Sequence, residues 1–150
     1  PNVVPCSLPG DRAVSVKATI GGSDYTVTCV SMGNPHCVVF TDHVDALDLN
    51  TLGPRFENDP LFPERVNAEF VRVVNPTTLR MRCFERGSGE TMACGTGACA
   101  AAAAAVENGL SPRDTDILVQ VPGGKLYVRV TDETVIHIIL LIVFPLAKNK

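Results

Sequence analysis

The chain has 150 residues, of which 45% are hydrophobic and 19% are charged, and its formal net charge is −3. This length and composition are typical of one folded globular domain and exclude an intrinsically disordered chain. The sequence has no basic block, which excludes the charge pattern of a nucleic-acid-binding protein, so a small molecule or a protein is the expected partner.

Alternating apolar and polar residues predict a β-hairpin near the start of the chain, with strands over 12–20 and 25–32. A short buried strand is expected at 37–40. Asp45 is then placed to cap a helical turn, which we expect Gly53 and Pro54 to end. Two further alternating runs, 68–74 and 78–84, are joined by turn residues and predict a second hairpin.

A run of alanines predicts one helix over residues 96–108, with Asn108 and Gly109 placed to end it in the left-handed conformation. Because alanine side chains are small on every face of this helix, the strands of a sheet can pack closely around its backbone. Later apolar segments predict further strands at 116–121, 125–130 and 134–144. We therefore expect an α+β fold, a mainly antiparallel sheet or barrel wrapped around one central alanine-rich helix, as a single domain over 1–150.

The six cysteines indicate reduced thiols, because they form no Cys-x-x-Cys pair and no metal-finger spacing, and the chain is too long for a disulfide-stapled mini-protein. A cytoplasmic protein is therefore expected. The most apolar segment, 135–147, is far shorter than the ~20 residues that a membrane-spanning helix requires, so we expect no membrane anchor.

Cys94 stands just before the predicted helix, where free N–H groups and the helix dipole stabilise a thiolate. Gly95 and Gly97 permit close backbone approach and Thr96 offers a hydroxyl, so the same helix end can hold a carboxylate or a phosphate. A thiol protease, a redox thiol and a proton-transfer thiol are the competing enzyme classes. Cys99 is poorly placed for a disulfide with Cys94, which disfavours redox exchange. A purely structural helix start is the non-functional alternative.

His36 forms a second polar group together with Asn34, on a turn that enters an apolar strand. Side chains at such a position are held in place yet remain accessible. Taken alone, His36 is as consistent with a structural histidine as with a catalytic one.

Three segments, MGNPHCVVF, RVNAEFV and ERGSGETMACGTGACA, resemble the diaminopimelate epimerase family in their order and spacing, and the resemblance spans roughly residues 30–130. It implies an isomerase that needs neither pyridoxal phosphate nor a metal and that interconverts L,L- and meso-diaminopimelate for lysine and cell-wall synthesis. In that family two cysteines act on opposite faces of the α-carbon. One thiolate removes the proton and the other thiol delivers one.

The resemblance also implies roles for individual residues. Cys94 matches one of the two catalytic cysteines, and His36 and Glu85 match polar residues that support the thiols. The residues that match the family's substrate-binding positions are Asn34, Asn67, Glu85, Arg86, Gly95 and Thr96. Gly95 and Thr96 would hold the α-carboxylate, and Arg86 would pair with the distal carboxylate through two hydrogen bonds.

The family's other catalytic cysteine lies in a Cys-Gly-Asn motif, and this motif does not occur in the 150 residues. We therefore expect this chain to be the C-terminal half of a longer product, with its N-terminal half as a partner and no activity in isolation. The first residues include no Met, and the tail from about 135 departs from the family pattern. An exposed docking surface predicts a homodimer or aggregation of the isolated chain.

Packing is the expected role of the remaining cysteines outside the helix, namely Cys6, Cys29, Cys37 and Cys83. Two alternative functions stay open. One is a two-thiol racemase for another amino acid, such as proline, hydroxyproline or histidine. The other is a non-catalytic ligand-binding remnant.

Overall fold

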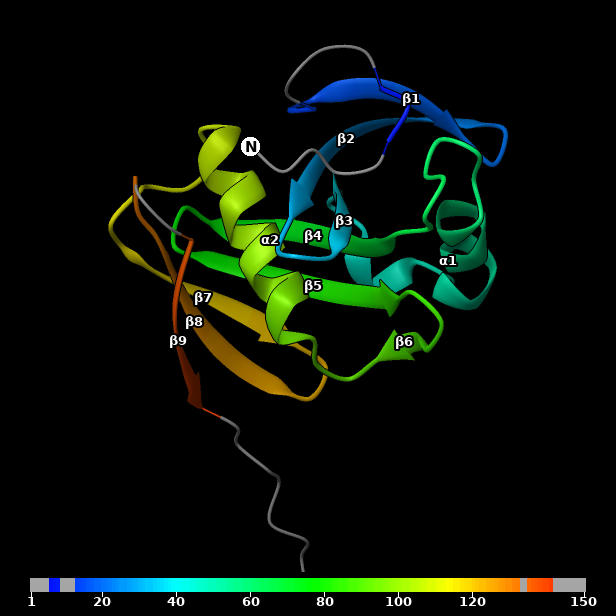
Figure 1. Ribbon diagram of the computed structural model, residues 1–150. Coiled ribbons are helices and arrows are strands. Elements are labelled where there is room, and N and C mark those ends of the chain that lie inside the picture. The colour runs from blue at the N-terminus through cyan, green and yellow to red at the C-terminus, as the bar shows by residue number, and fades with distance from the viewer. Residues whose placement is uncertain (1–5, 9–12, 133–134, 142–150) are drawn as a thin grey trace, which may run out of the picture.

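The computed structural model describes residues 6–8, 13–132 and 135–141, and it contains one nine-stranded sheet (Figure 1). The strands are β1 Val16–Ile20, β2 Ser23–Ser31, β3 Pro35–Phe40, β4 Asn67–Asn75, β5 Thr78–Glu85, β6 Gly89–Thr91, β7 Asp116–Val121, β8 Gly124–Val130 and β9 Val135–Leu141. Their order in the sheet is β1-β2-β3-β4-β5-β7-β8-β9, and β6 pairs with β5. The helical elements are the short 3₁₀ helix η1 Val44–Ala46, α1 Leu49–Glu57 and α2 Gly95–Glu107.

The sheet is mixed but mainly antiparallel, which confirms the predicted α+β class. Six of the eight strand pairings are antiparallel, and the two parallel ones join β3 to β4 and β5 to β7. The hairpins β4–β5 and β7–β8 match the predicted strands to within one residue at each end, whereas β1 begins only at Val16 and β2 begins at Ser23, two residues before its predicted start. A local period of two is sufficient to locate such hairpins, because each strand pairs with its neighbour in sequence.

The two faces of the sheet pack into two separate hydrophobic cores. Adjacent residues of β3 illustrate this, since Val38 packs in the core that contains α2 and Val39 packs in the core that contains Phe56 of α1. Successive side chains of a strand point to opposite faces, so a strand that is buried on both sides reads as a continuous apolar run. The helices α1 and α2 accordingly lie on different faces of the sheet.

Helix α2 agrees with its predicted limits to within one residue at each end. Its residues from Gly97 to Val106 are buried, and the small alanine side chains let strands of the sheet approach the helix backbone. Gly109 follows the helix with a φ of +70°, and the amide of Leu110 donates to the carbonyl oxygen of Ala105. This is the left-handed termination that Asn108 and Gly109 predicted.

The prediction that Gly53 and Pro54 end a helical turn was wrong, because both lie inside α1. An added Cβ at Gly53 would lie 2.2 Å from the ring of Phe84. The glycine is therefore required by the close approach of the helix to β5 and does not act as a terminator. Asp45, which was expected to cap this turn, lies instead within η1.

Neither helix of the described residues has the length and apolar character that crossing a membrane requires. Strand β9 forms an antiparallel pair with β8, within the segment 134–144 where the sequence predicted a strand. The remainder of the predicted tail, 142–150, lies outside the described residues.

Candidate active site

Three neighbouring strands place polar side chains on the face of the sheet that α2 covers. On β3, His36 lies two residues before Val38, which packs against α2, so the two side chains share that face. On the next strands Glu69 and Cys83 are direct partners in the register of β4 and β5. Because Cys83 also packs in the α2 core, this pairing brings Glu69 to the same face.

A buried ion pair lies at the centre of this group. Nδ1 of His36 and Oε1 of Glu69 are 2.7 Å apart, and both side chains are 0% exposed. Burial raises the pKa of Glu69 to about 7, although the hydrogen bond and charge of His36 oppose this increase. Burial alone would lower the pKa of His36, but the hydrogen bond and charge of Glu69 outweigh it, so its pKa is raised. The pair can therefore exchange a proton near neutral pH.

Cys94 is the N-cap residue of α2, as the sequence predicted. Its Sγ accepts a hydrogen bond of 3.2 Å from the backbone N–H of Gly97 and lies 3.6 Å from the hydroxyl oxygen of Thr96. A hydrogen bond from Cys83 is the largest cause that lowers the pKa of the Cys94 thiol to about 6, with Thr96 and Gly97 contributing in the same direction. Cys94 can therefore be a thiolate at neutral pH.

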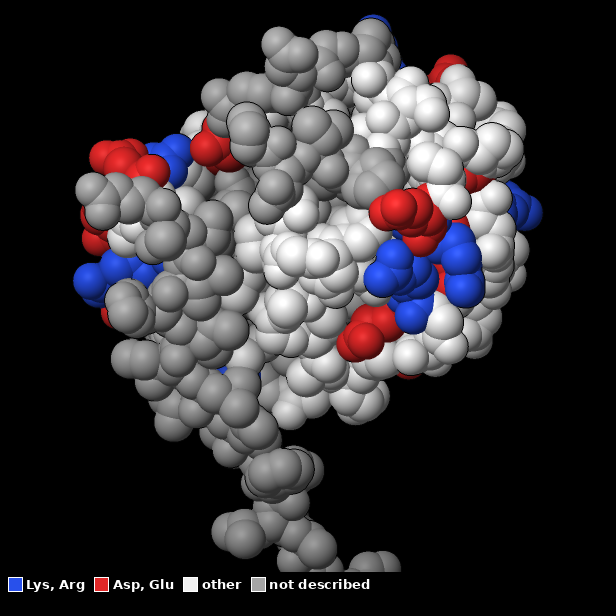
Figure 2. Space-filling view, in the orientation of Figure 1, with Lys and Arg blue, Asp and Glu red and all other residues white. Residues whose placement is uncertain are grey.

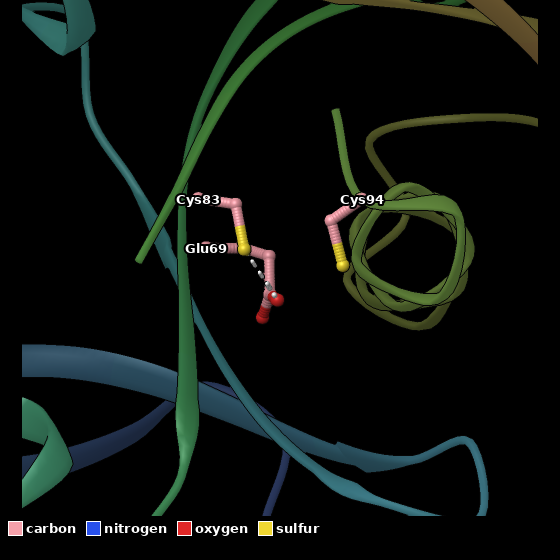
Figure 3. Close-up of side chains that lie close together, drawn as sticks. All are labelled: Glu69, Cys83 and Cys94. Carbon is pink, nitrogen blue, oxygen red and sulfur yellow. Dashed lines mark hydrogen bonds between the residues drawn. The ribbon is translucent and has the colours of Figure 1, made fainter. Parts of the chain in front are cut away.

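Cys83 connects the ion pair to Cys94. Its sulfur also lies 3.4 Å from Oε1 of Glu69, so the carboxylate and the Cys94 sulfur are alternative acceptors for its single proton. The contact with Cys94 and burial raise the pKa of Cys83 far above its usual range. One oxygen of Glu69 and the two sulfur atoms lie within 4.8 Å of one another (Figure 3). The prediction that Cys83 serves packing alone was therefore incomplete.

Gly97 allows α2 to approach this cluster closely. A Cβ at this position would lie 2.9 Å from Oε1 of Glu69 and 3.1 Å from Sγ of Cys94. The neighbouring residues Gly95 and Thr96 are exposed, so the first turn of the helix faces solvent beside a buried thiol. An accessible helix N-terminus of this kind binds carboxylates and phosphates.

The polar residues expected at the distal end of a substrate differ in exposure, since Arg86 is exposed, Asn34 is half-buried and Asn67 is buried. Oδ1 of Asn34 is 3.0 Å from Nε2 of His36, while Asn67 donates to the carbonyl oxygen of Pro35 and accepts from the backbone N–H of Arg86. The guanidinium of Arg86 is exposed and donates to the carbonyl oxygen of Glu64. Asn67 thus joins the first residue of β3 to the loop after β5.

Glu85, predicted to support the thiols, lies two residues after Cys83 and therefore on the same face of β5. Its Oε1 accepts a hydrogen bond of 2.7 Å from the hydroxyl of Thr91, which holds the carboxylate against the short strand β6. The negative charge of Glu85 contributes to the raised pKa of His36 and partly opposes the lowering of the pKa of Cys94.

The molecular surface near this site has an uncharged part and a part that carries charges of both signs. In the view of Figure 2, the surface around the lower half of α2 is uncharged, while acidic and basic side chains lie side by side beyond the end of β5. An uncharged surface next to mixed charges is suited to a partner or ligand that has both apolar and ionic parts.

Sequence reasoning missed Glu69. The available signal was the single carboxylate within the apolar strand segment NAEFV, whose neighbours Ala68 and Phe70 are buried. A lone charge on a strand that is buried on both faces requires a partner. Sequence reasoning also found no metal-ligand cluster, because Glu69, Cys83 and Cys94 are contributed by three separate elements.

Comparison with known proteins gives a consistent family. A family model described as diaminopimelate epimerase matches residues 28–139. Diaminopimelate epimerases of Cyanothece sp. and Acetivibrio thermocellus are each 54% identical to this chain, over 79% and 86% of its length. That of Desulfovibrio desulfuricans is 50% identical over 85% of the chain. The matches cover only 42%, 45% and 43% of these three relatives, so the chain spans less than half of their length.

Among solved structures, the chain is similar to a phenazine biosynthesis protein of the PhzF family from Bacillus anthracis. The two are 23% identical, with a TM-score of 0.49, over 70% of this chain and 34% of the other. A phenazine biosynthesis PhzC/PhzF protein from Clostridium difficile gives 23% identity and a TM-score of 0.47.

Proposed function

Because this chain belongs to the diaminopimelate epimerase family, we propose that it carries one of the two proton-transferring thiols of an enzyme that interconverts L,L- and meso-diaminopimelate. The observation that carries the proposal is the position of Cys94, a buried thiol that caps α2 beside an exposed first turn. The second thiol would come from the other half of the same protein, as the family resemblance implies.

In the proposed reaction, the α-carboxylate of the substrate binds at the N-terminus of α2, against the backbone of Gly95 and Thr96. The Cys94 thiolate takes the proton from the α-carbon on one face, and the carbon is left with the electron pair of the broken C–H bond. The bound carboxylate spreads this charge. A thiol on the opposite face then delivers a proton, which inverts the centre. In the reverse direction Cys94 acts as the acid.

The surrounding polar residues would keep the reacting groups in the required protonation states. Glu69 and Cys83 lie against Cys94, and His36 connects Glu69 to Asn34. Under this proposal His36 and Glu85 are positioning residues that set the charge around Cys94. Asn34, Asn67 and Arg86 would read the distal end of diaminopimelate, where the guanidinium pairs with a carboxylate.

The product of this reaction would serve lysine and peptidoglycan precursor synthesis, and the protein would act in the cytoplasm without a cofactor. These expectations derive from the family resemblance. A racemase for another amino acid would use the same thiol but would lack a substrate carboxylate for Arg86 to recognise.

Hydrogen exchange tests the proposal directly. The chain is combined with the amino-terminal part of the Cyanothece relative and incubated with L,L-diaminopimelate in heavy water, and deuterium at the α-carbon is followed by NMR. We expect exchange that Cys94→Ala abolishes, whereas Cys99→Ala, which alters a buried thiol of the same helix, retains it.

The same assay distinguishes the alternatives. Arg86→Ala should raise KM for diaminopimelate at least about tenfold if the guanidinium recognises a carboxylate. Unchanged turnover in Arg86→Ala would favour a racemase of another amino acid. Tight binding of diaminopimelate without any exchange would favour a non-catalytic module, and exchange that persists in Cys94→Ala would contradict the role of this thiol.

A further inference from the structure

Glu69, Cys83 and Cys94 converge from three elements of the fold. Glu69 lies on β4, Cys83 is its register partner on β5, and Cys94 caps α2 above them. Figure 3 shows that the side chains of Glu69 and Cys83 extend from the strands toward the helix, and that the sulfur of Cys94 faces them. Each residue offers one ligand atom, and these atoms lie within 4.8 Å of one another.

Glu69 also carries a polar atom that lacks a partner. Its Oε1 contacts His36 and Cys83, but its Oε2 is buried and has no hydrogen-bond partner among the described residues. The side chain is 0% exposed, so water does not satisfy this oxygen from the surface. A buried carboxylate oxygen without a partner costs about 1–3 kcal/mol or more, and such atoms are rare in folded proteins.

We infer that Glu69, Cys83 and Cys94 form a binding site for a thiophilic divalent cation of the Zn²⁺ class. Two sulfur ligands and one oxygen ligand favour Zn²⁺ over Mg²⁺ or Ca²⁺, which prefer oxygen ligands alone. In tetrahedral coordination the Zn–S and Zn–O distances are about 2.3 Å and 2.0–2.2 Å, which places the ligand atoms about 3.5 Å apart. Small rotations of side chains that already lie within 4.8 Å would reach this arrangement.

Binding at this site would involve a balanced exchange of protons. The cation forms bonds to two thiolates and one carboxylate oxygen, and any protons on the two sulfur atoms leave to solvent. Cys94 is 9% exposed and lies beside the open first turn of α2, which gives the cation a route of entry and leaves a fourth coordination position. The site shares Cys94 with the proposed reaction, although that reaction itself invokes no metal.

The functional consequence of binding is reversible inhibition, because coordination to the cation lowers the basicity of the Cys94 sulfur and places the cation where the α-proton would have to approach. This consequence rests on the proposed function, whereas the binding itself does not. The two are tested by separate measurements, so failure of one is distinguishable from failure of the other.

Cobalt is the probe for binding, because Co²⁺ takes the same ligands as Zn²⁺ and reports thiolate coordination by a charge-transfer band in the near ultraviolet. The reduced 150-residue chain is titrated with Co²⁺ under anaerobic conditions. We expect a band that saturates at one equivalent, visible bands of tetrahedral Co²⁺, and loss of both when Zn²⁺ is added.

Variants assign the ligands. Cys94→Ser retains a preferred N-cap residue, so the helix is preserved while a thiolate is removed. We expect the charge-transfer band to fall to about half in Cys94→Ser and in Cys83→Ser, since its intensity scales with the number of thiolate ligands. Glu69→Gln should weaken Co²⁺ binding at least about tenfold. Circular dichroism verifies that each variant is folded.

Cys29→Ala is the matched control, because Cys29 is a thiol of the opposite core, beside Cys37 in the sheet register. This variant should retain the full band. Absence of a thiolate band in the unaltered chain would overturn the inference, as would a band that is unaffected by Cys94→Ser or lost in Cys29→Ala. If the proposed reaction is present, Zn²⁺ should inhibit the exchange and a chelator should restore it.

Discussion

Cys94 lies at the end of a series of contacts that begins at Asn34. Asn34 contacts His36, His36 pairs with Glu69, and the carboxylate of Glu69 lies against the sulfur atoms. Glu69 and Cys94 in this series have pKa values of about 7 and about 6, so their protonation changes near neutral pH. The charge on Cys94 therefore depends on the buried residues Glu69 and Cys83, and single substitutions at these two positions test this dependence.

We expect the Cys94 thiol to be half ionised near pH 6, compared with 9.0 for an unperturbed cysteine, because hydrogen bonds from Cys83, Thr96 and Gly97 stabilise the thiolate. With a chelator present, its rate of alkylation by iodoacetamide should rise from about pH 5 to about pH 7 and then level off. Cys83→Ala removes the strongest of these contacts and should move the midpoint up by about one unit or more.

Mass spectrometry identifies which thiol reacts in this experiment. Cys99 is the internal control, since burial and the charge of Cys94 raise the pKa of Cys99 to about 11, and it should remain unmodified. A midpoint near 9.0 for Cys94 in the unaltered chain would contradict the proposed network of hydrogen bonds.

Single and double substitutions of His36 and Glu69 measure how much the buried pair contributes to the free energy of unfolding. His36→Leu leaves the carboxylate of Glu69 buried without its partner, which should reduce the free energy of unfolding by about 3–5 kcal/mol at pH 8. At pH 5 the loss should be smaller, because an unpaired buried carboxyl takes up a proton and no longer carries charge. Urea unfolding at both pH values measures the difference.

The control for this prediction is the double variant in which both residues are replaced by Leu. It removes the charge together with its partner and should be more stable than His36→Leu alone at pH 8. If His36→Leu reduced the free energy of unfolding equally at pH 8 and pH 5, the charge of the Glu69 carboxylate would not be the cause of the loss.

At the scale of elements, the contact between α1 and β5 is set by a glycine. The ring of Phe84 occupies the space that a side chain at Gly53 would need. Gly53→Ala should therefore destabilise the chain by about 1–3 kcal/mol through overpacking, although alanine is the better helix former. Asn50→Ala, on the exposed side of the same helix, should change stability by less than about 0.5 kcal/mol. Thermal unfolding of both variants tests this, and a stabilised Gly53→Ala would refute the contact.

At the scale of the whole molecule, the surface beside Cys94 has exposed apolar character. Met92 is 64% exposed and lies two residues before Cys94, and the chain spans only 42% of the Cyanothece relative. We expect the isolated chain to self-associate through this surface, as a dimer or larger, because exposed apolar patches drive association.

Light scattering measures this self-association. Met92→Ser should shift the equilibrium toward the monomer, whereas Val74→Ser, at an apolar residue that is 46% exposed at the far end of β4, should leave it unchanged. A stable monomer of the unaltered chain at low and high concentration would contradict the prediction.

The sequence by itself determined the features that depend on local chemistry. The alternation of β5, the alanine-rich helix, its N-cap at Cys94 and its glycine termination all result from interactions among residues close in sequence. Local propensity and capping specify such elements before any long-range contact forms. The family motifs predicted the candidate residues for the same reason, since each motif is continuous in the chain.

Only the tertiary structure decided which side chains meet. Glu69 and Cys83 became part of the site because the register of β4 and β5 makes them partners, and Cys94 joined them because α2 packs on that face. A glycine is likewise required at position 53 because of the ring of Phe84, a residue that is distant in sequence. Strand register and helix packing are set by the summed burial of many distant residues, so no local pattern reports them.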